Sequence, residues 1–175
     1  MPAVRHGKIG TVLGELTVVM EDEAVTGIYF ENHEHLPDES AFGTAIDTTV
    51  DATSVELLQT VKREMDEYLS RERTEFSVAL RPQGSQFSLD VWALLQEIPY
   101  GHTQTYGELA EKMGNRHLAQ RVGQVVGRNP LSIIIPCHRV IGADGSLTGY
   151  AGGLDRKRFL LELEEPAEAS AARLF

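Results

Sequence analysis

The sequence has only one cysteine and one tryptophan, and it contains no long apolar run. A single cysteine excludes an internal disulfide and a cysteine-rich zinc cluster, so the thiol of Cys137 would matter through its reactivity. No segment approaches the roughly 18 apolar residues of a membrane-spanning helix, and the N-terminus lacks the basic-then-apolar order of a signal peptide. We therefore expect a cytoplasmic protein that makes no contact with a membrane.

Basic residues are also scarce, since 16 Lys and Arg stand against 26 Asp and Glu and the formal net charge is −10. Taken over the whole chain, this balance argues against a nucleic-acid partner, because phosphate binding depends on Lys and Arg. The acidity is concentrated in residues 1–82, which contain 7 basic and 16 acidic residues. Between Glu111 and Asp144 there is no acidic residue, and the basic residues there are Lys112, Arg116, Arg121, Arg128 and Arg139. An acidic protein thus contains one local stretch suited to phosphates.

The stretch Arg81-Pro82-Gln83-Gly84 is the clearest domain-boundary signal, because Pro and Gly interrupt regular structure and the charge balance changes there. A chain of 175 residues, 42% apolar and 24% charged, is long enough for one ordinary folded domain or two small ones. We expect an α+β domain over residues 1–82, a second domain over residues 83–165 and a flexible tail over residues 166–175.

The first domain is expected to begin with a small antiparallel sheet, since residues 9–30 alternate apolar and polar side chains with turn signals between them. An irregular connection over residues 31–53 is expected to follow. The pattern then predicts a helix over residues 55–70 capped by Ser54, and a strand over residues 76–80.

The second domain is predicted to be mainly helical. Apolar residues at helical spacing indicate helices over residues 87–97 and 117–127, and residues 131–135 resemble an apolar strand. Further helices are expected over residues 106–113, between these two, and over residues 154–164. Thr105 is the expected N-cap of the helix over residues 106–113. The turn Gly114-Asn115 gives the middle pair a helix-turn-helix pattern, which is also that of any helical hairpin. The basic residues in and beside the second helix of the pair favour DNA binding.

Cys137 follows the apolar residues 131–135 and Pro136, and it precedes His138 and Arg139. A lone cysteine after Ile and Pro is most often an inert buried residue. A free thiol has a pKa of about 8.5, which a nearby imidazole and a cation can lower to give a nucleophilic thiolate. His138 and Arg139 supply both chemical types, so Cys137 is the candidate nucleophile.

The segment Pro136-Cys137-His138-Arg139-Val140 resembles the active-site signature of the O6-alkylguanine-DNA alkyltransferases, also called methylated-DNA–protein-cysteine methyltransferases. The resemblance covers about residues 84–165 and extends, in the family's order and approximate spacing, to Gln86-Phe87, Val91-Trp92, Leu95, Ile98-Pro99-Tyr100-Gly101, Thr105-Tyr106, Leu109-Ala110, Val122-Gly123, Asn129-Pro130 and Tyr150-Ala151-Gly152-Gly153-Leu154. It implies a winged-helix-like second domain with a helix-turn-helix. The first domain shows a pattern compatible with the family's ribonuclease-H-like N-terminal domain.

This resemblance implies direct DNA repair. The thiolate of Cys137 would attack the alkyl carbon on guanine O6 in double-stranded DNA, with thymine O4 as a second candidate substrate, and would keep the alkyl group. The transfer would be stoichiometric and irreversible, it would need no cofactor or metal, and the protein would act as a monomer.

The resemblance also implies roles for individual residues. His138, oriented by Glu164, would activate Cys137 through a water molecule, and the neighbouring Glu165 is the alternative partner of the histidine. Asn129 would brace the helix-turn-helix against the active-site segment. The residues implied to contact the flipped base are Tyr106, the Val140 carbonyl, Tyr150 and the Ala151 backbone.

One position departs from the family pattern. The family fills the gap left by the flipped nucleotide with the Arg of an Arg-Ala-Val-Gly sequence, whereas this chain reads Gln120-Arg121-Val122-Gly123. Either Gln120 fills the gap or Arg121 does so through a shifted helix. One residue rotates a helix position by about 100°, and we therefore favour Gln120 in the base stack. Arg121, Arg116 and Arg128 are the expected phosphate contacts.

Three other functions compete with transfer. A sensor that grips alkylated bases without reacting would share the DNA-binding features, but the retained Cys137 argues against it. A cysteine hydrolase or acyltransferase would need Cys137 and His138 to face each other, which adjacent residues rarely do, and no oxyanion loop is evident. His33 and His35 are a weak candidate metal pair, since no cysteine accompanies them.

Overall fold

The computed structural model describes residues 3–166, so the predicted tail lies, apart from Pro166, outside the described residues. The chain divides into two compact units. The first consists of Met1–Gln83 with Pro130–Ile134, and the second of Gly84–Asn129 with Ile135–Phe175. No helix among residues 3–166 is long and apolar enough to cross a membrane.

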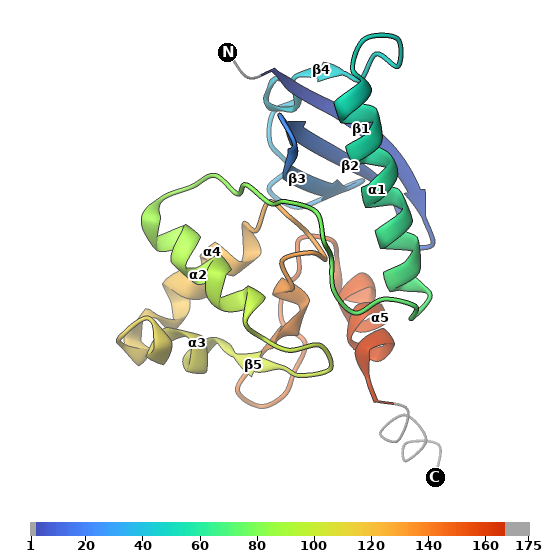
Figure 1. Cartoon of the computed structure of the whole chain (residues 1–175). Helices are drawn as coiled ribbons and strands as arrows, with labels where there is room; N and C mark the ends of the chain where they lie inside the picture. The colour runs from blue at the N-terminus through green and yellow to red at the C-terminus, as the bar shows by residue number, and fades with distance from the viewer. Residues whose placement is uncertain (1–2, 167–175) are drawn as a thin grey trace. The chain divides into compact units, whose positions relative to one another are not determined.

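The first unit is built on a four-stranded sheet in the order β3-β2-β1-β4 (Figure 1). β1 (Val4–Thr11), β2 (Gly14–Glu21) and β3 (Ala24–Phe30) form two antiparallel hairpins, as the alternating pattern predicts, although β1 begins five residues before the predicted start. The connection that follows contains a short 3-10 helix, Glu39–Phe42, and β4 (Thr44–Ala45), which pairs in parallel with β1.

Helix α1 (Ala52–Leu69) packs against β1 and crosses the sheet (Figure 1). The predicted cap at Ser54 is wrong, because the helix begins three residues earlier and Asp51 is its N-cap residue. Asp51 is held by contacts that no local pattern shows, since Oδ2 accepts from the Arg5 guanidinium at 3.1 Å and from the Asp47 amide at 2.8 Å. The buried face of the helix includes Val61, Met65 and Tyr68.

The predicted strand over residues 76–80 is also wrong. Only Leu80 forms a bridge, with Val25 of β3, through hydrogen bonds that involve the Ala79 carbonyl and the Arg81 amide. The preceding residues are held by a side chain instead, because the buried carboxylate of Glu64 on α1 accepts from the amide and hydroxyl of Ser77.

The apolar segment over residues 131–135 is not a strand, which corrects the sequence-based expectation. Its residues form turns, Ile133 has a φ of 73°, and only Leu131 forms a bridge, with Ile28 of β3. The Ile28 amide donates to the Pro130 carbonyl at 2.7 Å, and the Ser132 amide donates to the Ile28 carbonyl at 3.3 Å. These bonds place Pro130–Ile134 in the first unit, whereas the division at residue 82 assigns them to the second domain.

The second unit is mainly helical. Its elements are α2 (Gln86–Gln96), β5 (Gln104–Thr105), α3 (Tyr106–Lys112), the 3-10 helix Arg116–Leu118, α4 (Ala119–Gly127), the 3-10 helix Cys137–Arg139, β6 (Val140–Ile141) and α5 (Leu154–Glu164). The cap at Thr105 is confirmed, since its hydroxyl accepts from the Glu108 amide at 3.1 Å. α4 is fixed to α2 by the Trp92 indole, which donates to the Val125 carbonyl at 3.0 Å.

Candidate active site

Cys137 opens a single 3-10 turn immediately after Pro136. Only 7% of the residue is exposed. The side chain of Asn129, two residues after α4, donates to the Ile135 carbonyl at 2.8 Å and also hydrogen-bonds the thiol. Asn129 therefore connects the end of the predicted helix-turn-helix to the segment that carries the thiol.

The pKa of the Cys137 thiol is set by opposing effects. Burial raises it, because a thiolate loses its hydration inside the protein. The hydrogen bond from Asn129 and the positive charge of Lys157 both act in the opposite direction. The surroundings thus contain specific groups that favour the thiolate, although their effect does not outweigh that of burial.

His138 is fully buried, and its Nε2 lies 2.9 Å from Oε2 of Glu164 on α5. The structure therefore pairs His138 with Glu164. Glu165, the alternative partner of the histidine, is the C-cap residue of α5. Burial lowers the pKa of His138 more than Glu164 raises it, so the ring is neutral at pH 7. An ionised carboxylate only accepts hydrogen bonds, which places the imidazole proton on Nε2 and makes Nδ1 the basic nitrogen.

Arg139 is aimed at the same carboxylate rather than at the thiol. Its Nε lies 2.7 Å from Glu164 Oε1, its Nη2 lies 2.8 Å from Oε2, and its Nη1 donates to the Ile98 carbonyl at 2.6 Å. Burial would raise the pKa of Glu164, but the hydrogen bonds from His138 and Arg139 outweigh it and lower the pKa to about 2. The carboxylate that orients His138 is thus charged at neutral pH and is hydrogen-bonded by two side chains.

Lys157 is a buried cation that sequence reasoning missed. It lies on α5 with 0% exposure, and its Nζ donates to the Thr148 carbonyl at 2.8 Å. Burial lowers the pKa of Lys157 to about 8, while the negative charge of a Cys137 thiolate raises it. Its neighbours Arg156 and Arg158 give the local sequence the appearance of a solvated stretch. The sequence pattern that could have identified Lys157 as buried is its helical spacing to the buried Leu160 and Glu164.

The residues implied to contact the base lie in the same unit as the thiol. Tyr150 is buried, and burial raises its phenol pKa well above the ordinary value, so it stays neutral. The Val140 backbone is fixed by parallel pairing of β6 with β5. Tyr106, the first residue of α3, accepts a 2.9 Å hydrogen bond from the Thr148 hydroxyl. A thiolate at Cys137 raises the pKa of both tyrosines, which places their hydroxyls within electrostatic reach of the sulfur.

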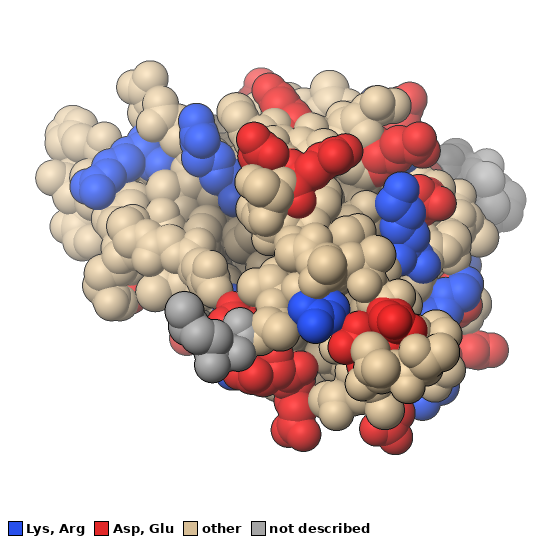
Figure 2. All heavy atoms as spheres, turned by 90° about the horizontal axis from the view of Figure 1, so that it is seen from above, with Lys and Arg blue, Asp and Glu red and all other residues tan. Residues whose placement is uncertain are grey.

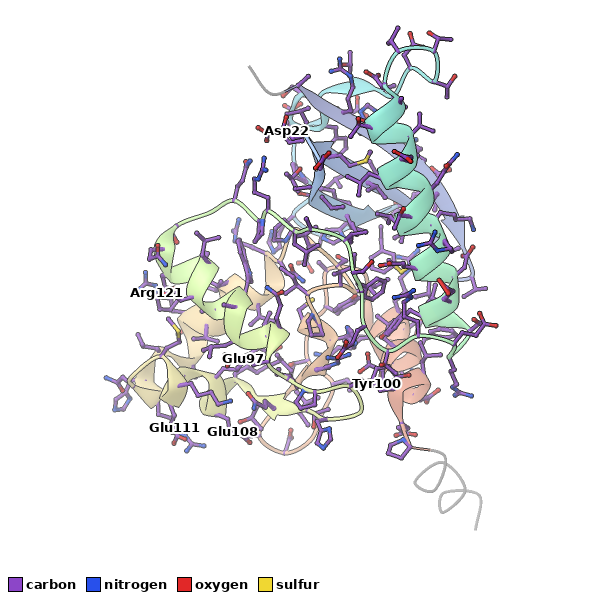
Figure 3. All side chains as sticks on the ribbon, in the orientation of Figure 1. Asp22, Glu97, Tyr100, Glu108, Glu111 and Arg121 are labelled. Atoms are coloured by element: carbon purple, nitrogen blue, oxygen red, sulfur yellow. The ribbon has the colours of Figure 1, made fainter. Side chains whose placement is uncertain are left out.

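The predicted DNA-contacting residues lie on or beside α4, and all four are exposed. The Arg121 guanidinium lies over the Phe87 ring of α2, 3.7 Å from its centroid, and Figure 3 shows Arg121 next to that helix. Arg116 pairs with Glu111 of α3 at 2.5 Å. Gln120 belongs to the first turn of α4, and Arg128 is its C-cap residue. Figure 2 shows basic side chains at the left of the view with no acidic side chain between them, and basic and acidic side chains interspersed toward the right.

No group of three or more His, Cys, Asp or Glu able to hold a metal ion occurs among the described residues. His33 instead has a structural role at the end of β3, because its Nδ1 accepts from the Phe30 amide at 3.3 Å and its ring stacks on Phe30. The candidate metal pair is therefore not supported.

Two family models match the chain. Residues 4–82 match the ribonuclease-like domain of 6-O-methylguanine DNA methyltransferase, and residues 86–166 match the DNA binding domain of the same family.

Relatives with a known assignment match over all or part of the chain. A methylated-DNA–protein-cysteine methyltransferase of Mycolicibacterium paratuberculosis is 39% identical over 98% of this chain and 99% of its own. One from Methanosarcina acetivorans is 51% identical over 62% of this chain and 70% of its own. The crystal structure of Mycobacterium tuberculosis OGT in complex with DNA is 36% identical, covers 96% of this chain and 98% of its own, and has a TM-score of 0.78.

Proposed function

Since the chain belongs to the 6-O-methylguanine DNA methyltransferase family and acts as a methylated-DNA–protein-cysteine methyltransferase, we propose that Cys137 is the residue that receives the alkyl group. The observation that carries this proposal is the position of the chain's only cysteine, which hydrogen-bonds Asn129 and precedes a buried histidine paired with a carboxylate. The substrate is O6-alkylguanine in double-stranded DNA, and O4-alkylthymine is a second substrate of the same chemistry.

The reaction is a displacement at a saturated carbon. The thiolate sulfur forms a bond to the alkyl carbon, the bond between that carbon and guanine O6 breaks, and its electron pair remains on the guanine. The proton that the thiol loses is balanced by the proton that a guanine ring nitrogen gains. Guanine is restored and Cys137 becomes an S-alkyl cysteine, so each protein molecule acts once and needs no cofactor.

His138 is the base in this proposal. Its Nδ1 takes the thiol proton through a water molecule, and the charged Glu164 stabilises the resulting imidazolium. Arg139 holds the Glu164 carboxylate in place with two hydrogen bonds of 2.7 and 2.8 Å. Because the structure pairs His138 with Glu164, we assign this role to Glu164 rather than to Glu165.

The leaving guanine needs a hydrogen-bond donor, because negative charge develops on it as the bond to the alkyl carbon breaks. Tyr106 supplies that donor in this proposal. The Val140 carbonyl, Tyr150 and the Ala151 backbone form the surface that receives the base.

DNA binding belongs to the second unit, where α3 and α4 form the helix-turn-helix. A homologue has been crystallised with DNA, which supports the same partner here. A base inside a duplex has to be rotated out before it can react, at a free-energy cost of a few kcal/mol. We propose that Gln120 fills the space that the rotated base leaves in the duplex. The residues proposed to contact phosphates are Arg116, Arg121 and Arg128.

The protein acts as a monomer in this proposal, because one chain carries the thiol, the base and the DNA-binding helices. The cytoplasm suits it, since thiols are kept reduced there and Cys137 has to remain a thiol until it reacts.

The test is the intact mass of the protein after incubation with a duplex that contains O6-methylguanine. We expect the mass of one methyl group, gained once per molecule. The Cys137→Ser variant should bind the duplex with unchanged affinity and gain no mass, because a hydroxyl is a far weaker nucleophile than a thiolate. Tight binding to the lesion without a mass gain by the unaltered protein would instead identify a sensor of alkylated bases.

A further inference from the structure

Thr148 lies in the segment between β6 and α5 and is fixed at two points. Its carbonyl accepts the 2.8 Å hydrogen bond from the fully buried Lys157 ammonium. Its hydroxyl donates to Tyr106 Oη at 2.9 Å. The hydrogen bond from Lys157 to the Thr148 carbonyl supports the one between Thr148 and Tyr106, because it fixes the backbone position from which the threonine hydroxyl reaches the tyrosine.

The direction of the second bond determines what Tyr106 is able to do. A phenol has one proton to donate and an oxygen that also accepts. When Thr148 is the donor in this bond, it occupies the accepting side of the phenol, and the Tyr106 proton is available for another partner. Hydrogen bonds also polarise one another in series, so a phenol that accepts one bond is a better donor in the next.

We propose that Thr148 is a positioning residue for alkyl transfer, which holds the Tyr106 hydroxyl so that its proton is directed to the leaving guanine. This inference rests on the proposed function, in which Tyr106 is the donor to the base. The chain of contacts Lys157, Thr148, Tyr106 then joins a cation within electrostatic reach of the nucleophile to the group that stabilises the leaving base.

Two substitutions at this position separate the hydroxyl from the shape of the side chain. Thr148→Val keeps the branched shape and removes the donor, whereas Thr148→Ser keeps the donor and removes a methyl group. The experiment measures single-turnover methyl transfer from a duplex containing O6-methylguanine over a range of protein concentrations. We expect Thr148→Val to lower the maximal rate about tenfold, on the order of one lost hydrogen bond. The concentration that gives half-maximal rate should not change, and Thr148→Ser should recover most of the rate.

A double-mutant cycle tests whether Thr148 acts through Tyr106. Tyr106→Phe should slow transfer, and adding Thr148→Val to it should slow transfer no further, because the acceptor is already absent. Alkylation of Cys137 by iodoacetamide gives a readout of the thiol alone, since iodide leaves without a hydrogen-bond donor. That reaction should proceed at the same rate with Thr148→Val as with threonine.

The inference is overturned if Thr148→Val transfers at the unaltered rate, if its effect adds fully to that of Tyr106→Phe, or if iodoacetamide alkylation slows in parallel. Parallel slowing would show a general disturbance of the site. A different result marks failure of the proposed role of Tyr106, namely a Tyr106→Phe variant that transfers as fast as the unaltered protein. Loss of the proposed function itself would appear as no methyl transfer by the unaltered chain.

Discussion

At the scale of single residues, the pKa of the Cys137 thiol depends on a cation of helix α5, the ammonium of Lys157. Burial raises the pKa of the thiol, and the ammonium of Lys157 is one of the groups that oppose this effect. We expect Lys157→Met to raise the pKa of Cys137 and to slow its reaction with iodoacetamide at pH 7. Because Cys137 is the only cysteine, the thiolate absorbance in an ultraviolet pH titration is assigned to it directly.

The pH dependence of this effect has a definite sign. The pKa of Lys157 is lowered to about 8, so the ammonium loses its proton as the pH rises through that value and its attraction for the thiolate fades. The difference in thiol reactivity between Lys157→Met and the unaltered protein should therefore shrink above about pH 8. Arg158→Met is the matched control, because Arg158 is an exposed cation on the same helix. An equal slowing by both variants would contradict a specific role for Lys157.

The residues of the site were predictable to different degrees. Cys137 and His138 were singled out by the residues around the thiol, and Glu164 was implied by the family resemblance; the structure brings His138 and Glu164 together at 2.9 Å. The Lys157 ammonium and the Thr148 hydroxyl did not follow, because their contacts depend on how the segment after β6 folds. That segment has no repeating pattern from which its path could be predicted.

At the scale of elements, the helices were predicted to within three residues of their observed bounds. α3 has its cap at Thr105, and α5 has the predicted bounds. The two predicted strands over residues 76–80 and 131–135 failed for a common reason. Short apolar runs satisfy a strand pattern, but a strand also needs a partner over several residues, and each run meets β3 at a single bridge.

Helix α4 places two neighbouring residues in different surroundings. The Arg121 guanidinium stacks on Phe87 of α2, whereas Gln120 lies one position earlier, about 100° around the helix. We expect Gln120→Ala to slow methyl transfer from duplex DNA several-fold and to change transfer from single-stranded DNA much less, because only the duplex has a gap to fill. The measurement is the single-turnover rate with the lesion in both forms.

Arg121→Ala provides the contrast to Gln120→Ala. If Arg121 contacts a phosphate, its loss should weaken binding to DNA of any sequence and lower the slope of log affinity against log salt by about 0.9. The ratio of duplex to single-strand transfer rates should stay the same. The reverse pattern, in which Arg121→Ala selectively slows transfer from the duplex, would assign the gap to Arg121 and overturn the role of Gln120.

At the scale of the whole molecule, the folded state depends on an ion pair that belongs to the site. The pKa of Glu164 is about 2 in the folded protein, well below its ordinary value of 4.5, so folding favours the charged carboxylate. A group of this kind stabilises the protein above the unfolded pKa and loses that contribution as the pH falls through the folded pKa. The contribution is on the order of 3 kcal/mol, and it should disappear between about pH 4.5 and pH 2.

Urea unfolding at a series of pH values tests this dependence, with fluorescence of the buried Trp92 as a probe of the second unit. Glu164→Gln should lower the free energy of unfolding at pH 7 by about 3–5 kcal/mol, because it leaves the Arg139 charge buried without a counter-charge. The difference from the unaltered protein should narrow as the pH falls below 4.5, since protonation removes the same charge from Glu164. Glu162→Gln, on the exposed side of α5, should lower stability by less than about 0.5 kcal/mol at pH 7. A gap between Glu164→Gln and the unaltered protein that stays constant from pH 7 to pH 2.5 would show that the carboxylate charge does not stabilise the fold.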